Sequence, residues 1–206
     1  MGTFTLEKYQ KYYNRDYDVA LSKYGIEYKS VLIKYPTLNK RERQISTLRD
    51  SVLEKSMSLS NIDSTYGIGA AEFWIKYMLI ELFQFLGAFD VVTIYQVKAT
   101  AWRIRTKYYY LTLSELTYFF YCYSIGDYGK LYAGRTVNPQ DILIGLDIFS
   151  KDVRSVRDEV NGIENAERIS KEFHENKSKS ISYQEWKMLK GNDTTNIDRL
   201  KEAFGV

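Results

Sequence analysis

Two clusters of basic and aromatic residues carry the clearest chemical signal in this sequence. Lys98, Trp102 and Arg105 are spaced at i, i+4 and i+7, so they share one face if the segment is helical. A second cluster lies in a glycine-bearing turn and comprises Tyr128, Lys130, Tyr132 and Arg135. Cations that contact phosphates, combined with aromatic faces on which bases stack, are typical of sequence-tolerant single-strand binding. Both clusters are therefore candidate binding sites for nucleic acid or for a protein partner.

Each cluster also has a purely structural interpretation. Trp102 and several tyrosines could belong to the core, with the charges solvating the opposite face. In the turn, Tyr128 and Tyr132 could anchor the chain to the core while Lys130 and Arg135 cap backbone carbonyls. The sequence leaves both interpretations open, and they differ in whether these side chains are exposed.

The chain offers few groups for catalysis. His174 is the single histidine and stands in the charged run KEFHENKSK, and Cys122 is the single cysteine, among apolar neighbours. One histidine and one cysteine cannot supply the usual zinc ligands, and the sequence has neither a Walker lysine motif nor a dinucleotide fingerprint. Glu81 interrupts an apolar helix face and is predicted to pair with Arg103 or Arg105. We therefore expect a non-enzymatic protein without metal or cofactor, with a surface histidine and a buried thiol.

Helices are the elements predicted to position the two clusters. Thr112 and Glu115 have the spacing of a capping box, which predicts a helix that ends at Gly126. A second start signal, Asn138 followed by a proline, predicts another helix beyond the turn. The turn and its cluster are therefore expected between two helices.

The helix predicted after Asn138 has the most regular apolar pattern in the chain. Its apolar residues alternate spacings of four and three, at Ile142, Leu146, Phe149, Val153, Val156 and Val160. The Asn161–Gly162 step is predicted to end it after about 20 residues, close to 30 Å at 1.5 Å per residue. The apolar stripe could pack within the same chain or form a seam for a partner helix.

Apolar residues recur at helical spacing elsewhere too, over residues 6–24, 28–35, 38–52 and 71–86. The last of these segments is predicted to be capped by Gly87. Val91–Val97 is rich enough in β-branched residues to form a strand instead. With only two prolines in 206 residues, we predict an all-α, multi-helix bundle with an N-terminal helical arm and a short C-terminal helical tail.

Two stretches of connector-like composition divide the sequence. Residues 56–61, together with the Gly67–Gly69 step, mark the first, and the KSKS run at 177–180 marks the second. We expect three parts: an N-terminal arm over residues 1–60, a central helical core over 61–162 and a charged helical tail over 163–206.

Composition restricts the partners and the compartment. The formal charge of +3 is nearly neutral, which permits transient contact with an anionic polymer without requiring it. Nineteen tyrosines exceed the needs of a core and suit partly buried contacts with other molecules. The apolar run at 73–97 contains Lys76, Glu81 and Asp90 and is not expected to span a membrane. The lone cysteine and the absence of a signal-like start predict a reducing, cytoplasmic location.

The central block combines a YYLTL helix start at 109–113, a GxYGKxY turn at 126–132 and an ILxxL helix at 142–146. With these three motifs it resembles a block found in a family of small helical proteins from phages and mobile elements of gut bacteria. The sequence departs from the family at 132–138, where it has YAGRTVN in place of an aspartate-rich YDRxDG loop. If that loop recognises a target, the target is expected to differ here.

The resemblance implies a function in replication. The family is associated with replication or helicase loading, so the expected function is that of an accessory adaptor between a replication protein and DNA. Two alternatives stay open: a virion structural or packaged protein whose tyrosines form subunit contacts, and an inhibitor that binds a host protein. The expected partners are a protein, nucleic acid and further copies of the chain, in the bacterial cytoplasm or in the virion.

Overall fold

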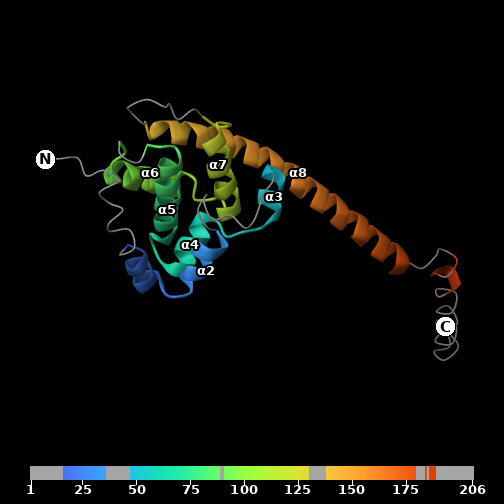
Figure 1. The fold of residues 1–206 in the computed structure, drawn as a ribbon. Helices are drawn as coiled ribbons and strands as arrows, with labels where there is room; N and C mark the ends of the chain where they lie inside the picture. The colour runs from blue at the N-terminus through green and yellow to red at the C-terminus, as the bar shows by residue number, and fades with distance from the viewer. Residues whose placement is uncertain are drawn as a thin grey trace, which may run out of the picture. The chain divides into compact units, whose positions relative to one another are not determined.

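The computed structural model describes residues 16–35, 47–88, 91–129 and 138–179, together with residues 184 and 186–188. These residues form helices joined by turns; no strand occurs among them, and Ser58 and Thr112 form an isolated antiparallel bridge. The predicted all-α, multi-helix architecture is confirmed (Figure 1). The chain divides into two compact units, Met1–Glu159 and Val160–Val206, and each is described by itself.

The helices of the first unit follow one another along the chain (Figure 1). Residues 16–24 are helical and precede α2 (Tyr28–Lys34), α3 (Leu48–Leu53), α4 (Leu59–Tyr66), α5 (Ala70–Phe85), α6 (Ile94–Lys107) and α7 (Leu113–Ile125). The long helix α8 (Gln140–Lys179) begins in this unit and continues into the second.

Capping side chains determine where several helices begin. Thr47, Thr93 and Thr112 each accept a hydrogen bond from the backbone N–H three residues later, and the residue there accepts one from the threonine N–H. The capping box predicted at Thr112 is thus confirmed. The box at Thr93 leads the segment 91–97 into a helix, so the strand alternative for this segment is wrong. Asn138 Oδ1 accepts a hydrogen bond from the first N–H of α8 at 3.1 Å, which confirms the predicted start there.

Left-handed glycines follow the ends of α5 and α7. Gly87 has a φ of 67° and Gly126 a φ of 97°, in a region that residues with a Cβ rarely adopt. α5 ends at Phe85 and α7 at Ile125, within one residue of the predicted positions. These two glycines therefore act as the stop signals that the sequence indicated.

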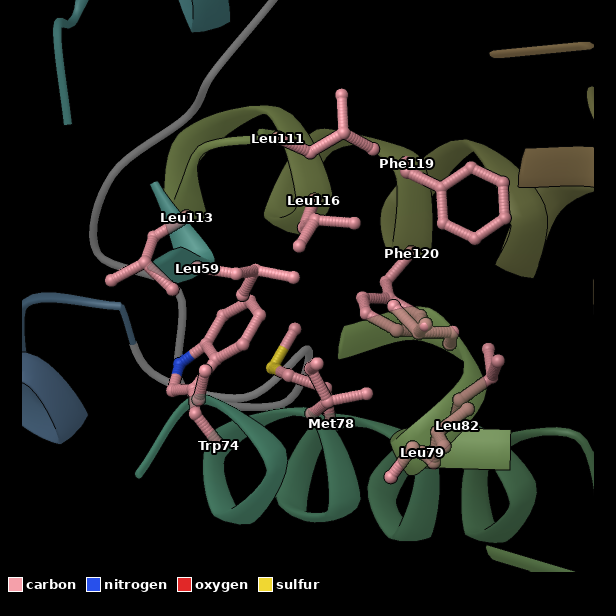
Figure 2. Packing of buried hydrophobic residues seen from close by; sticks show 14 of the residues in the cluster. Leu59, Trp74, Met78, Leu79, Leu82, Leu111, Leu113, Leu116, Phe119 and Phe120 are labelled. Atoms are coloured by element: carbon pink, nitrogen blue, oxygen red, sulfur yellow. The ribbon is translucent and has the colours of Figure 1, made fainter. Parts of the chain in front are cut away.

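The core of the first unit is built around α5, which contacts α4, α6 and α7. Trp74, Met78 and Leu82 of α5 point toward Leu116 and Phe120 of α7 and are fully buried (Figure 2). Burying one such side chain contributes roughly 1.5–3 kcal/mol. The α5–α7 contact is therefore one of the contacts that stabilise this unit.

The described part of the N-terminal segment packs into the same core. Tyr28 Oη donates a hydrogen bond to the carbonyl oxygen of Ala70 at 2.6 Å. The indole N–H of Trp74 donates to the carbonyl oxygen of Tyr35 at 3.3 Å. The described residues of the expected arm, 16–35 and 47–60, thus contribute buried side chains to the core of the first unit.

Residues 56–61, expected as a connector, join α3 to α4 through 56–58 and are hydrogen-bonded into the fold. The N–H groups of Leu59 and Ser60 donate to the carbonyl oxygens of Leu111 and Tyr109, both at 3.0 Å. α4 begins within the segment, at residue 59. Serine-rich composition is ambiguous because serine hydroxyls serve helix caps as readily as turns.

Two predicted helix boundaries were also wrong. Thr47 is extended, with φ −136° and ψ 161°, so no single helix runs through 38–52; residues 36–46 lie outside the described residues. α8 continues through Asn161–Gly162 to Lys179 and is 40 residues long. A glycine inside a helix costs only about 1 kcal/mol relative to alanine, which pairs such as Arg168–Glu172 at 3.5 Å help to offset.

Beyond the buried Val160, the described side chains of α8 in the second unit are exposed on every face of the helix. Every residue from 161 to 177 is exposed. The apolar Ile163, Ile169 and Phe173 are 42%, 60% and 64% exposed. His174 is also exposed, as predicted, with its ring 5.9 Å from that of Phe173. This part of α8 is amphipathic, and no described residue of its unit covers its apolar side chains.

Candidate functional site

The buried face of α6 fixes which of its side chains point outward. Val97, Ala101 and Ile104 are fully buried in the core beside α5. The outward side chains recur every three or four residues, at Tyr95, Lys98, Trp102 and Thr106. Trp102 is 54% exposed, so the alternative that it belongs to the core is wrong.

Exposed aromatic residues recur every seven positions along this segment. Tyr95, Trp102 and Tyr109 are 78%, 54% and 56% exposed. Seven residues are nearly two turns, or about 10.5 Å, so Tyr95 and Trp102 present their rings on one side of α6. Tyr109 follows the C-cap residue of α6, and its ring lies edge-on to that of Tyr110 at 5.7 Å. Tyr95 and Tyr109 are not among the residues predicted from the sequence, although their spacing from Trp102 is the signal that finds them.

Arg105, predicted to share the binding face, has a structural role. Its guanidinium forms an ion pair with Asp63 of α4, and the two side chains are 24% and 15% exposed. Asp63 also accepts hydrogen bonds from the N–H groups of Gly69 and Ala71, at 3.1 and 3.0 Å. Arg105 therefore links α6 to α4 and to the start of α5. The carboxylate that it neutralises is Asp63 rather than the predicted Glu81.

Two basic residues of α6 are left for an external anion. α6 contains no Asp or Glu. Besides Arg105, Lys107 is also paired: its Nζ lies 2.6 and 2.8 Å from the two carboxylate oxygens of Asp147. Lys98 and Arg103 are exposed and have no ion-pair partner within the described part of the chain. The outward surface of α6 is consequently aromatic and positively charged.

α8 holds the C-terminal end of α6 in place. The hydroxyl of Tyr108 donates to Asp147 Oδ1 at 2.8 Å and lies 3.0 Å from the carbonyl oxygen of Leu143. Burial, helped by the Asp147 carboxylate, raises the pKa of Tyr108. Hydrogen bonds from Lys107 and Tyr108 hold the pKa of Asp147 below its usual range. These contacts fix the backbone from which Tyr109 projects.

The second predicted cluster lies largely outside the described residues. This applies to Lys130, Tyr132 and Arg135, whose roles stay predictions. The ring of Tyr128 packs against Phe119 and Phe149, with centroid distances of 6.0 and 5.3 Å. Its hydroxyl donates to Asp152 at 3.1 Å, and burial raises its pKa. Tyr128 therefore anchors the turn to the core, which is the structural interpretation of this residue.

No comparison supplies a function. The chain matches no protein-family model, no curated protein and no solved structure. Among the described residues, no group of three His, Cys, Asp or Glu could hold a metal ion, and no helix combines the length and hydropathy needed to cross a membrane. The resemblance of residues 109–146 stays a prediction, and the α6 surface is the best-defined candidate site.

Proposed function

We propose that this protein is a non-enzymatic accessory protein that binds single-stranded nucleic acid through the α6 face. The α6 face is the exposed set Tyr95, Lys98, Trp102, Arg103 and Tyr109. The observation that supports the proposal most directly is that Trp102 is exposed between the exposed rings of Tyr95 and Tyr109. Two exposed cations without an ion-pair partner among the described residues, Lys98 and Arg103, lie beside it.

The α6 face combines the two energetic contributions that such binding needs. Stacking of a base on an aromatic side chain contributes about 1–3 kcal/mol and tolerates any sequence, because every base has a π-face. Each phosphate neutralised by a cation releases counterions and adds about 0.7 to the salt dependence of single-strand binding. Lys98 and Arg103 would supply the phosphate contacts, while Tyr95 and Trp102 would stack with bases.

We further propose that this binding serves replication, as the resemblance of residues 109–146 to phage and mobile-element proteins implies. The protein would act as an adaptor that holds a replication protein, such as a helicase, near single-stranded DNA in the bacterial cytoplasm. The replication protein would bind a surface other than the α6 face, because the strand occupies that face.

A second candidate is a virion protein that makes subunit contacts. The exposed apolar residues Ile163, Ile169 and Phe173 on α8 favour it, since such side chains suit a protein–protein contact. The two candidates differ in their ligand: the first needs a nucleic acid, and the second needs other protein subunits.

Fluorescence anisotropy of a labelled oligo-dT strand tests the aromatic part of the α6 face. Trp102→Ala is expected to weaken binding by about 5- to 150-fold, which corresponds to the loss of one stacked base. Tyr121→Ala is the matched control, because Tyr121 is 41% exposed and lies on α7. Wild-type protein that fails to bind the strand, or equal weakening by both substitutions, would contradict the proposal.

The salt dependence of strand binding tests the basic part of the α6 face. Lys98→Ala and Arg103→Ala are each expected to reduce the slope of log K against log salt concentration by about 0.7. Arg154→Ala, which removes an exposed basic side chain from α8, serves as the control and should leave the slope unchanged. A slope that changes equally in all three variants would indicate a general charge effect rather than a site.

A further inference from the structure

The part of α8 in the second unit carries an exposed apolar face. At 100° per residue, Ile163, Ala166, Ile169 and Phe173 fall within an arc of about 120°. The other residues of this arc are the small Gly162 and Ser170 and, near the end of the helix, Lys177. The other charged side chains of residues 161–179 occupy the rest of the circumference: Glu164, Glu167, Arg168, Lys171, Glu172, Glu175 and Lys179. The segment thus has the two-sided pattern of a helix that packs on something.

No described residue of its own unit buries this apolar face. Residues 161–177 are exposed throughout, and a Cβ added to Gly162 would meet no atom within 4 Å. In proteins, helical stability comes mostly from packing an amphipathic face rather than from intrinsic propensity. The glycine inside the helix lowers that propensity further, by about 1 kcal/mol relative to alanine.

Charge is segregated along the same segment. Residues 160–167 contain two carboxylates, Glu164 and Glu167, and no base. Residues 168–179 contain four basic residues and two carboxylates, Glu172 and Glu175, and so carry a net charge of +2. The two halves of the segment therefore have charges of −2 and +2 and are complementary to each other.

We propose that a second copy of this chain covers the apolar face, with the two 160–179 segments antiparallel. In that arrangement the acidic half of each helix lies beside the basic half of the other, and the apolar faces of both are buried. A parallel pair would set like charges side by side along its whole length, which is unfavourable. This contact uses none of the residues of the α6 face, so the dimer would carry two copies of that face.

Sedimentation equilibrium of the full chain tests the proposal over about 1 µM to about 1 mM. The wild-type mass is expected to rise from that of the monomer to that of the dimer. Glu164→Lys with Glu167→Lys makes both halves basic and should weaken dimerisation at least about tenfold. Glu172→Lys with Glu175→Lys is the matched control: it changes the net charge by the same amount, but it keeps the halves complementary and should preserve the dimer.

Charge complementation gives a second measurement. Arg168→Glu with Lys171→Glu makes both halves acidic, so this variant alone should be monomeric. Mixed with the Glu164→Lys, Glu167→Lys variant, it should form a one-to-one dimer. Phe173→Glu, on the apolar face, should abolish association in every background.

Three results would overturn the proposal. The first is a wild-type protein that stays monomeric over the whole range, as a solvated single helix would. The second is a dimer that Glu172→Lys with Glu175→Lys weakens more than Glu164→Lys with Glu167→Lys does, because that order is expected of a parallel pair. The third is a dimer that Phe173→Glu leaves intact. All the substituted residues are exposed, so thermal melts should confirm that the first unit is still folded.

Discussion

Replacing Arg157 would test how α8 is attached to the start of α7. The Arg157 guanidinium donates from Nε to Glu115 Oε1 at 2.8 Å and from Nη2 to Oε2 at 2.6 Å. Nη2 also lies 3.2 Å from the carbonyl oxygen of Tyr110. The Glu115 side chain is 1% exposed, and its other hydrogen bond comes from the Thr112 N–H at 2.8 Å. Without Arg157, a buried carboxylate would keep only the capping bond.

The magnitude follows from the burial of the two partners. Removing one member of a buried ion pair costs 3–5 kcal/mol, because the other charge is left without compensation. The Arg157 side chain is 31% exposed, so water can reach part of the vacated site, and the lower end of the range applies. We expect Arg157→Met, which retains the apolar stem, to lower the free energy of unfolding by about 3 kcal/mol.

Urea denaturation followed by circular dichroism measures this loss. With a slope of about 2 kcal/mol per molar urea, the midpoint should fall by about 1.5 M. Adding Glu115→Gln should recover at least half of the loss, since no charge is then left buried. Arg49→Met is the control, because Arg49 and Glu159 form an exposed pair at 2.6 Å that contributes at most about 1 kcal/mol. Equal losses for Arg157→Met and Arg49→Met would refute the reasoning.

Three further predictions concern the packing of α8 and the acid stability of the first unit. Phe149→Ala should lower the free energy of unfolding in urea by about 3–5 kcal/mol, because Phe149 is fully buried, and a loss near zero would contradict this. Gly145→Ala should lower the thermal midpoint despite a gain in helix propensity, because the added Cβ would lie 2.5 Å from the carbonyl oxygen of Tyr128. A higher midpoint would contradict this prediction. The pKa of Asp147 is lowered in the folded state, chiefly by the hydrogen bond from Lys107. As the pH falls, the unfolded state therefore takes up the proton before the folded state does. The stability that the ionised Asp147 contributes is complete above about pH 4 and is lost as the pH falls through the folded pKa. Asp147→Asn should therefore reduce the acid-induced drop in thermal midpoint between about pH 5 and pH 2, and an unchanged drop would count against it.

Local signals predicted the helix boundaries that local interactions determine. The capping box at Thr112 and the left-handed Gly126 both act within a single turn of backbone, and both lie where the sequence indicated. Residues 56–61 differ because their partners are carbonyl oxygens at 109 and 111, which no local pattern reveals. The prediction that the helix ends at Gly162 was wrong for a related reason. A glycine can end a helix, but whether it does so depends on whether the residues beyond it make stabilising contacts after a turn.

The candidate site was predictable in part. Helical spacing alone placed Lys98 and Trp102 on one face, and the structure adds that this face is exposed. Arg105 fits the same spacing, yet it pairs with Asp63, which is 42 residues earlier in the sequence. A pairing over that distance depends on how α4 and α6 pack, and spacing within one helix does not contain this information.

The hydrogen bonds that tie residues 56–60 to 109–114 also affect how the protein is made. Ser56 and Ser114, whose hydroxyls lie 2.6 Å apart, are separated by 58 residues of sequence. A ribosome that adds 5–20 residues per second needs about 3–12 s to bridge that separation. During this interval Leu59 and Ile62, which are fully buried in the finished fold, have no completed core to enter. We therefore expect the nascent chain to be open to chaperones and to aggregation at least until the start of α7 has left the exit tunnel.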